Sequence, residues 1–200
     1  MYVEQLTPQQ AERLGPLQRD ALADLLRDAV QSGASVGFLA PLSARNARAY
    51  WCGVLAALGD ELGLWLAYEG RRIIGAIQLA QCGKDNGRHR AEVQKLFVLR
   101  EFRVRGVARA LLAAVEQQAK KNGIRLLVLD TEADSPAAKL YRRLGWQEAG
   151  LIPDYALSPD GRLHPTLYFY KTLSPSSPKR ANPAASRTRA NAEPMHLVMI

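Results

Sequence analysis

The stretch that decides the fold is AEVQKLFVLREFRVRGVARALLAAV, residues 91–115. Its first nine residues are rich in β-branched and aromatic side chains, which predicts a strand. From Gly106 the sequence predicts a helix that runs to about Lys121. The segment between them, RVRGVAR at residues 103–109, has small residues at Gly106 and Ala108 that let the backbone approach a ligand closely. Unpaired N–H groups at the start of the helix, together with the arginines, therefore predict a pyrophosphate-binding turn.

Basic charge gathers around the same segment. The chain has 27 Lys and Arg residues against 19 Asp and Glu residues, a formal net charge of +8. Residues 88–109 hold seven basic and two acidic side chains, and residues 174–200 hold four basic and one acidic. A local positive field favours an anionic ligand, although a solvated charged turn is the plain alternative. This distribution indicates one small, highly anionic partner rather than a long polyanion.

The rest of the chain predicts helices and strands that alternate. Helices are predicted at residues 8–31, 43–58, 106–121 and 135–144, and strands at residues 62–68, 72–81, 91–99, 124–130, 146–151 and 167–173. The turn Glu69-Gly70 between the first two strands favours an antiparallel hairpin. A hairpin followed by alternating strands and helices predicts an α/β fold with a mixed sheet.

Length and composition bound the class of protein. Residues 1–173 are expected to form one domain, because 200 residues with 48% hydrophobic side chains suffice for one ordinary core. Residues 174–200 are rich in Ser, Pro, Ala and Arg and are expected to be disordered. Two cysteines without metal-ligand spacing predict neither a disulfide scaffold nor a metal site. Without a signal-peptide pattern or a long apolar run, we expect a cytoplasmic protein with no membrane partner.

Two motifs carry a family resemblance. The pattern R-x-x-G-x-A at residues 103–108 is followed, after a helix and a strand, by Leu140-Tyr141 and Gly145-Trp146. In this order the motifs resemble those of the GNAT N-acetyltransferase superfamily over residues 62–173, with Ala108 in place of the commoner Gly. More narrowly, three stretches resemble the tabtoxin resistance acetyltransferase subgroup: residues 90–96, 129–133 and 159–166.

The resemblance implies a mixed, mostly antiparallel sheet with helices on both faces. It also implies a V-shaped acetyl-CoA cleft between two parallel strands, which end near Leu99 and at Asp130. A bulge in the first strand would free backbone groups near Phe97 and Val98 for the thioester. Asp134 stands where many members carry Asn. The implied cofactor-binding residues are Phe97, Val98, Leu99, Arg103, Val104, Arg105, Gly106, Val107, Ala108, Arg109, Asp134 and Ser135.

Two carboxylates are candidates for the base that deprotonates an amine. Glu92 lies upstream of the implied thioester site, and Asp130 ends its predicted strand at the carboxyl edge, where open α/β sheets bind ligands. Converging there, they could hold an ammonium and accept its proton, directly or through water. The structural alternatives are an ion pair of Glu92 with Lys95 or Arg90, and a cap or turn bond for Asp130.

Tyr141 is the acid that the resemblance implies, because the family places this hydroxyl beside the sulfur of CoA. The alternative is a core tyrosine whose hydroxyl is hydrogen-bonded. The acceptor is expected near loop residues, with Tyr155, Arg162 and His164 as candidates for binding it.

These expectations together describe an enzyme that moves an acetyl group from acetyl-CoA to a primary amine of a small molecule. The acceptor would be amino-acid-like, or an antibiotic or toxin as in tabtoxin resistance, and would attack directly in a ternary complex. Two other functions remain open: a non-catalytic acyl-CoA sensor, and a basic nucleic-acid-binding protein, for which the sequence holds no recognisable motif. The sequence leaves the oligomeric state open.

Overall fold

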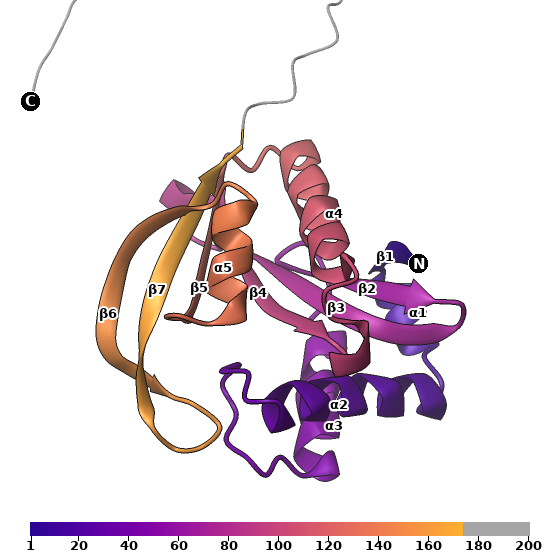
Figure 1. Cartoon of the computed structure of the whole chain (residues 1–200). Coiled ribbons are helices and arrows are strands. Elements are labelled where there is room, and N and C mark those ends of the chain that lie inside the picture. Colours follow the sequence, from indigo (N-terminus) through magenta and orange to yellow (C-terminus); the bar gives the residue numbers. More distant parts are fainter. Residues whose placement is uncertain (174–200) are drawn as a thin grey trace, which may run out of the picture.

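The computed structural model describes residues 1–173 (Figure 1). The expectation of a disordered tail concerns residues 174–200, which lie outside the described residues. Among the helices of residues 1–173, none has both the length and the apolar stretch that crossing a membrane requires.

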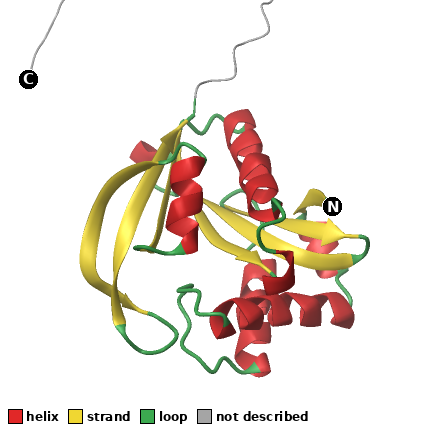
Figure 2. Cartoon of the chain, viewed as in Figure 1, coloured by secondary structure: helices red, strands yellow, loops and turns green. Residues whose placement is uncertain are grey.

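A seven-stranded sheet runs through the molecule in the order β1-β2-β3-β4-β5-β7-β6 (Figures 1 and 2). All neighbours are antiparallel except β4 and β5, which are parallel. The mixed, mostly antiparallel sheet is therefore confirmed. The strands are β1 (Tyr2–Leu6), β2 (Leu62–Glu69), β3 (Arg72–Gln81), β4 (Arg90–Val98), β5 (Leu126–Glu132), β6 (Gln147–Leu157) and β7 (Leu163–Thr172).

Helices cover both faces of the sheet, as expected. One buried cluster includes Leu111 of α4 and Tyr141 of α5, and a second includes Leu25 of α2 and Trp51 of α3. Each helix therefore buries one apolar face against its own side of the sheet. The helices are α1 (Pro8–Glu12), α2 (Pro16–Gln31), α3 (Ala44–Ala56), α4 (Val107–Lys121) and α5 (Pro136–Arg143).

The single helix predicted over residues 8–31 was wrong, because the chain forms two helices there. Thr7 caps α1, and its hydroxyl accepts a hydrogen bond from the N–H of Gln10. Pro16 then begins α2. A proline lacks the N–H that a continuing helix needs and disfavours helical backbone in the residue before it, so the first helix ends.

Strands were missed or predicted too short at the two edges of the sheet. No strand was predicted at residues 2–6, yet β1 pairs with β2 along its whole length. β6 continues past the predicted end at Leu151, through Pro153 and an irregular register, to Leu157. Edge strands tolerate proline and solvent-exposed residues, so their sequences lack the apolar pattern of a buried strand.

Candidate active site

The site begins with a bulge in β4. Gln94 lies opposite Gln78 of β3 and Phe97 lies opposite Ala76, so β4 has one residue more than its partner in this interval. Lys95 within the bulge has a φ of 52°, which is unusual for a residue with a side chain. The bulge that the resemblance implied in this strand is present, and it breaks the regular ladder just before the strand ends.

Close packing holds the end of β4 in place. A Cβ atom added to Gly75 of β3 would lie 2.9 Å from the carbonyl oxygen of Phe97. The backbone of Leu99, predicted to contact the cofactor, is already engaged: its N–H donates to the carbonyl of Ile74 and its carbonyl accepts from Phe102. Phe97 is itself buried, with 1% of its surface exposed. Gly75 therefore lets the backbones of β3 and β4 approach each other more closely than a residue with a side chain would allow.

The two parallel strands part after a short paired stretch. β4 and β5 pair only from Arg90 to Glu92 and from Leu126 to Val128, although β4 continues to Val98 and β5 to Glu132. Figure 1 shows β4 turning away from β5 and β7 beyond this point. The V-shaped separation of the expected fold is thus present, and its walls are the free edges of β4 and β5.

The pyrophosphate-binding turn predicted at residues 103–109 lies at the end of β4. Gly106 has a φ of 83° and directly precedes α4. The first hydrogen bond of α4 joins the N–H of Ala110 to the carbonyl of Gly106. The N–H groups of Val107, Ala108 and Arg109 therefore have no acceptor within the helix, and the positive end of its dipole points into the turn.

The arginines of this turn differ in what they contact. Arg103 donates from Nε to the carbonyl of Val98 at 3.1 Å and from Nη2 to the hydroxyl of Ser32 at 2.6 Å. Its guanidinium thus fastens the turn to the end of α2. Arg105 lies over the ring of Phe102, and Arg109 has no ion-pair partner among residues 1–173. These two side chains are the ones free to meet an anion.

Three further residues that were predicted to bind the cofactor lie in the turn or at the start of α5. Val104 is fully exposed and has a φ of 62°, which is strained for a β-branched residue. Ser135 caps α5, because its hydroxyl accepts from the N–H of Ala138 at 3.1 Å. Asp134 precedes it, exposed and with a φ of 61°. Strain of this kind persists only where the surrounding structure enforces it.

Asp130 lies on the β5 side of the separation, and Glu92 lies on the β4 side. Asp130 is two residues before the end of β5, so the prediction that it ends its strand was wrong, and it caps no helix. Partial desolvation, and then the negative charge of Glu92, raise the pKa of the Asp130 carboxyl above its ordinary value. Glu92 forms no ion pair with another described residue. The carboxylates are therefore close enough to affect each other, and neither is neutralised by a direct ion pair.

Lys95 is a third charged group at this point, which the sequence analysis considered only as an ion-pair partner. Its Nζ donates to the carbonyl of Val36 at 2.9 Å, in the segment between α2 and α3. Burial lowers the pKa of Lys95, while the charges of Asp130 and Glu92 oppose that change. The bulge thus directs the Lys95 ammonium to the segment between α2 and α3, at a position where the charges of both carboxylates still affect it.

Tyr141 approaches the same place from α5. Its ring packs between Trp146 and Phe169, and the residue is 5% exposed. Burial, and then the negative charge of Asp130, raise the pKa of its hydroxyl. That hydroxyl makes no hydrogen bond to another described residue, unlike the bonded core tyrosine of the alternative interpretation. The group remains protonated and available to a ligand.

The β6–β7 hairpin carries the three residues that were predicted to bind the acceptor. Tyr155 shares a hydrogen bond of 2.7 Å with the hydroxyl of Tyr168, and Tyr168 lies opposite Asp130. His164 lies 3.4 Å from Glu132, whereas Arg162 is 3.7 Å from Asp160 in the exposed turn. The structure therefore brings Tyr155 into contact with Tyr168, and Tyr168 lies beside Asp130. Arg162 instead pairs within its own turn.

Three parts of the site were not predicted from the sequence: Tyr168, Lys95 and the loop between α2 and α3. The N–H of Ala40 in that loop donates to the carbonyl of Pro159 in the β6–β7 hairpin at 3.0 Å. Figure 1 shows the two segments facing each other below the sheet. Among residues 1–173, no three His, Cys, Asp or Glu side chains are grouped so as to hold a metal ion.

Comparison of this chain with known proteins finds a matching family. The model of the acetyltransferase (GNAT) family matches residues 22–146, which include Glu92, the turn, Asp130 and Tyr141. The chain is 35% identical over 104 residues to an uncharacterized N-acetyltransferase of Azospirillum brasilense. It is 30% identical over 105 residues to an uncharacterized N-acetyltransferase of Bacillus subtilis. Each match covers 51% of this chain, and they cover 61% and 67% of the respective relatives.

Solved structures share the fold at low sequence identity. A ribosomal-protein-alanine N-acetyltransferase from Brucella melitensis is 21% identical, with a TM-score of 0.68 over 86% of this chain and 100% of its own. A putative acetyltransferase from Salmonella typhimurium, solved with its cofactor acetyl-CoA, is 17% identical, with a TM-score of 0.67 over 93% of this chain and 99% of its own.

Proposed function

The chain belongs to the GNAT acetyltransferase family, which uses acetyl-CoA, and on that premise we propose that it acetylates a primary amine of a small molecule. The observation that carries this proposal is the arrangement of Asp130, Glu92 and Tyr141 where β4 and β5 part. Two interacting carboxylates suit an ammonium, and a buried protonated hydroxyl suits a departing thiolate.

The turn before α4 fits the phosphates of acetyl-CoA. Unpaired N–H groups of Val107, Ala108 and Arg109 face an exposed turn, and the side chains of Arg105 and Arg109 are not neutralised. Backbone donors at a helix N-terminus bind phosphate groups well, and arginine adds charge-assisted hydrogen bonds. Arg103 contributes by holding the turn. When bound, acetyl-CoA supplies a thioester carbonyl that an amine can attack.

In the proposed reaction the acceptor arrives as an ammonium and is held by Asp130 and Glu92. The raised pKa of Asp130 brings this carboxylate closer to the basicity that proton removal needs. One carboxylate takes a proton from the ammonium, which leaves a neutral amine able to attack the thioester carbon of bound acetyl-CoA. As CoA departs, the second nitrogen proton would pass to the other carboxylate or to water. The Tyr141 hydroxyl would give a proton to the departing sulfur and regain one from solvent.

The acceptor class in this proposal is amino-acid-like, or an antibiotic or toxin as in the tabtoxin resistance subgroup. Support comes from the mixed charge around the site: the two carboxylates suit an amine, and Lys95 supplies positive charge nearby. A reducing cytoplasmic setting is part of the proposal, because Cys52 and Cys82 are unpaired.

The test measures CoA release with a panel of amines, amino acids and aminoglycosides, beside calorimetric titration with acetyl-CoA. We expect turnover with at least one small primary amine and a fall of about 100-fold in kcat for the double variant Glu92→Gln/Asp130→Asn. Glu12→Gln, at an exposed carboxylate on α1, serves as the matched control. Full activity of the double variant would contradict the base assignment. Acetyl-CoA binding without turnover on any amine would identify a sensor instead.

A further inference from the structure

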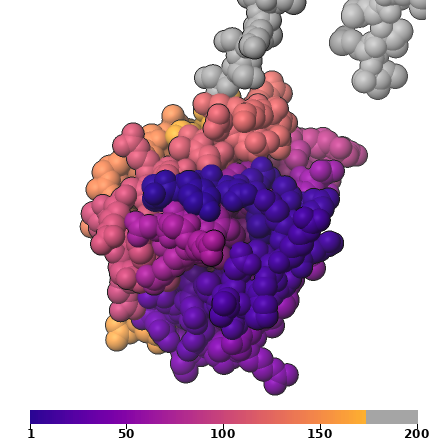
Figure 3. All heavy atoms as spheres, turned by 90° about the vertical axis from the view of Figure 1, so that its right-hand side faces the viewer, coloured from indigo at the N-terminus to yellow at the C-terminus, as the bar shows by residue number. Residues whose placement is uncertain are grey.

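A pocket outside the candidate active site lies where the β2–β3 turn meets the start of the chain. It has a volume of about 630 Å³, within the range of roughly 300–1,000 Å³ typical of small-molecule sites. In the sheet order, β3 separates β1 and β2 from β4, so this pocket is distinct from the candidate active site. Figure 3 shows this side of the molecule, where the magenta hairpin lies against indigo N-terminal residues. Its lining residues are Tyr2, Glu4, Gly15, Pro16, Leu17, Gln18, Tyr68 and Arg71.

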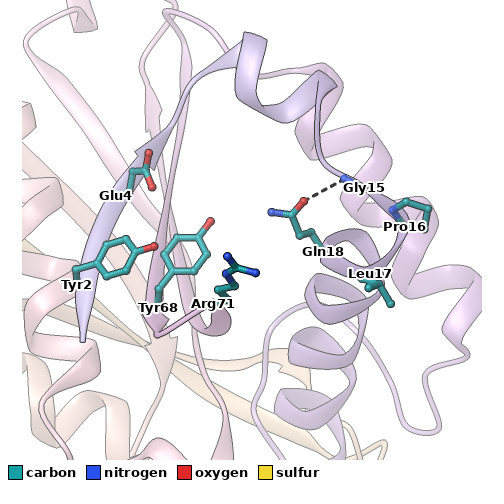
Figure 4. A pocket seen from close by; sticks show the side chains of 8 residues that line it. All are labelled: Tyr2, Glu4, Gly15, Pro16, Leu17, Gln18, Tyr68 and Arg71. Atoms are coloured by element: carbon teal, nitrogen blue, oxygen red, sulfur yellow. Dashed lines mark hydrogen bonds between the residues drawn. The ribbon is translucent and has the colours of Figure 1, made fainter.

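Tyr68 gives the pocket an aromatic wall and a hydroxyl that is available to a ligand. The residue is 8% exposed, and its ring stacks on that of Tyr2, with centroids 5.0 Å apart and planes 15° apart. Its hydroxyl takes part in no hydrogen bond with another described residue. Figure 4 shows this hydroxyl directed into the space between Glu4 and Gln18. The ring is buried while the hydroxyl reaches the open space of the pocket, so it is available to donate a hydrogen bond to a ligand there.

Opposite charges flank the tyrosine pair. In the pairing of β1 with β2, Glu4 is level with Leu66 and Tyr2 is level with Tyr68. Arg71 lies beyond the end of β2, in the turn that leads to β3. One carboxylate oxygen of Glu4 accepts from the amide of Gln10 at 2.8 Å, which leaves the other oxygen free. Arg71 has no ion pair or side-chain hydrogen bond to another of residues 1–173. The pocket therefore offers an anion at one end, a cation at the other and aromatic surface between them.

The spacing of these charges sets the length of the ligand. Strands rise about 3.3 Å per residue, so the backbone from Leu66 to the end of β2 at Glu69 already spans about 10 Å. The ammonium and carboxylate of a single amino acid share one carbon and cannot reach both groups. Leu17, which is 85% exposed, and Pro16 add an apolar wall. An extended zwitterion with a large apolar side chain fits this arrangement.

We propose that this pocket binds a short peptide of dipeptide length, with its ammonium at Glu4, its carboxylate at Arg71 and an apolar side chain against Tyr68 and Leu17. The carboxylate also reaches the free amide nitrogen of Gln18, whose oxygen already accepts from the N–H of Gly15. The Tyr68 hydroxyl donates to a peptide carbonyl. Each charged end of the ligand thus meets a group that has no full partner within the described chain.

The test is calorimetric titration of the full chain with the dipeptide Phe-Leu. Three further probes each remove one feature: N-acetyl-Phe-Leu lacks the ammonium, Phe-Leu amide lacks the carboxylate, and free phenylalanine lacks the length. We expect one site with a Kd below about 1 mM for Phe-Leu, and binding at least about five-fold weaker for each of the other probes.

Variants locate the site. Arg71→Gln weakens Phe-Leu binding about five-fold. It leaves the binding of Phe-Leu amide unaffected, because this ligand lacks the carboxylate that Arg71 contacts. Tyr68→Phe keeps the ring and weakens binding about three-fold. Arg45→Gln, which removes an exposed charge on α3, changes nothing. Acetyl-CoA titration of each variant confirms that it is folded. No binding at millimolar Phe-Leu, equal binding of free phenylalanine, or binding unchanged in Arg71→Gln and Tyr68→Phe would overturn the proposal.

Discussion

Tyr168 of β7 lies directly opposite Asp130 of β5, and its hydroxyl is 2.7 Å from that of Tyr155. The hydrogen bond with Tyr155, then burial and nearby negative charges, including those of Asp130 and Glu92, raise the pKa of Tyr168 to about 12. The hydroxyl therefore stays protonated over the working range of most enzymes. It can donate a hydrogen bond at the point where the proposed acceptor amine meets the carboxylates.

Tyr168→Phe tests that relationship. Removing the hydroxyl should raise the KM for the acceptor about five-fold, since one net hydrogen bond is worth about 1 kcal/mol. The affinity for acetyl-CoA should not change, because the turn before α4 is untouched. Steady-state kinetics with the acceptor varied, beside calorimetry with acetyl-CoA, separate the two effects. A loss confined to acetyl-CoA binding would place Tyr168 on the cofactor side instead.

The pH dependence of stability follows from Asp130. Folding raises the pKa of this carboxyl, so the folded protein binds the proton more readily than the unfolded chain does. At low pH the Asp130 carboxyl is protonated and uncharged, so its partial burial costs little folding free energy. As the pH rises through the raised pKa, the carboxyl ionises and that contribution to stability is lost. Asp130→Asn should therefore increase the free energy of unfolding at neutral pH, and the gain should shrink as the pH falls. Urea unfolding between about pH 4.5 and pH 8 measures this difference.

A gain that stays constant over that range would show that Asp130 is not desolvated as described. The same variant should lose acetyltransferase activity while it gains stability. Activity and stability often change in opposite directions when a catalytic group is held in an environment that is unfavourable for its charge.

Lys95 should influence the acceptor through the loop it holds. Lys95→Met removes the hydrogen bond to the carbonyl of Val36, which frees the segment between α2 and α3. We expect the KM for the acceptor to rise about ten-fold, because hydrogen bonds from charged groups are worth about 1.5 kcal/mol or more. Lys95→Arg keeps a charged donor and should recover part of the loss. A change in kcat alone, with KM unaltered, would instead assign Lys95 to the chemical step.

The central part of the fold could be predicted from the sequence because its signals are local. The helical spacing that leads to α4, the apolar run of β5 and the turn before β3 each lie within a few residues. The break before Pro16 was not predicted, although the defined effect of proline on helices could have indicated it. β1 was not predictable, because an edge strand with one buried residue, Leu6, has no apolar alternation.

The candidate site was only partly predictable because it depends on register. Asp130 and Glu92 follow from their positions near the ends of two strands. Tyr168 is found only once β7 is placed beside β5, and nothing local in the sequence sets that pairing. Lys95 resembles an ordinary exposed strand residue in the sequence. Its inward direction is a consequence of the bulge, which the resemblance implied but did not place at this residue.

Gly75→Ala tests the close contact beneath the bulge. The added methyl group would lie 2.9 Å from the backbone oxygen of Phe97 and 3.1 Å from side chains of Val107 and Leu111. We expect a loss of about 1–3 kcal/mol in the free energy of unfolding, together with weaker acetyl-CoA binding as the bulge shifts. Gly53→Ala, in open space on α3, is the control and should stabilise by about 0.5–1 kcal/mol. Equal effects of the two changes would contradict the packing argument.

Arg103 and Arg109 lie in the same basic turn and should respond differently to neutralisation. Arg103 is held by Val98 and Ser32, so Arg103→Gln should lower the free energy of unfolding by about 1 kcal/mol. Arg109→Gln should leave stability unchanged and weaken acetyl-CoA binding several-fold, with the loss shrinking as salt is added, because an exposed charge is screened. Urea unfolding and calorimetry at two salt concentrations distinguish these roles. A salt-dependent loss of affinity in Arg103→Gln, with none in Arg109→Gln, would mean that Arg103 leaves its structural partners to bind the phosphates.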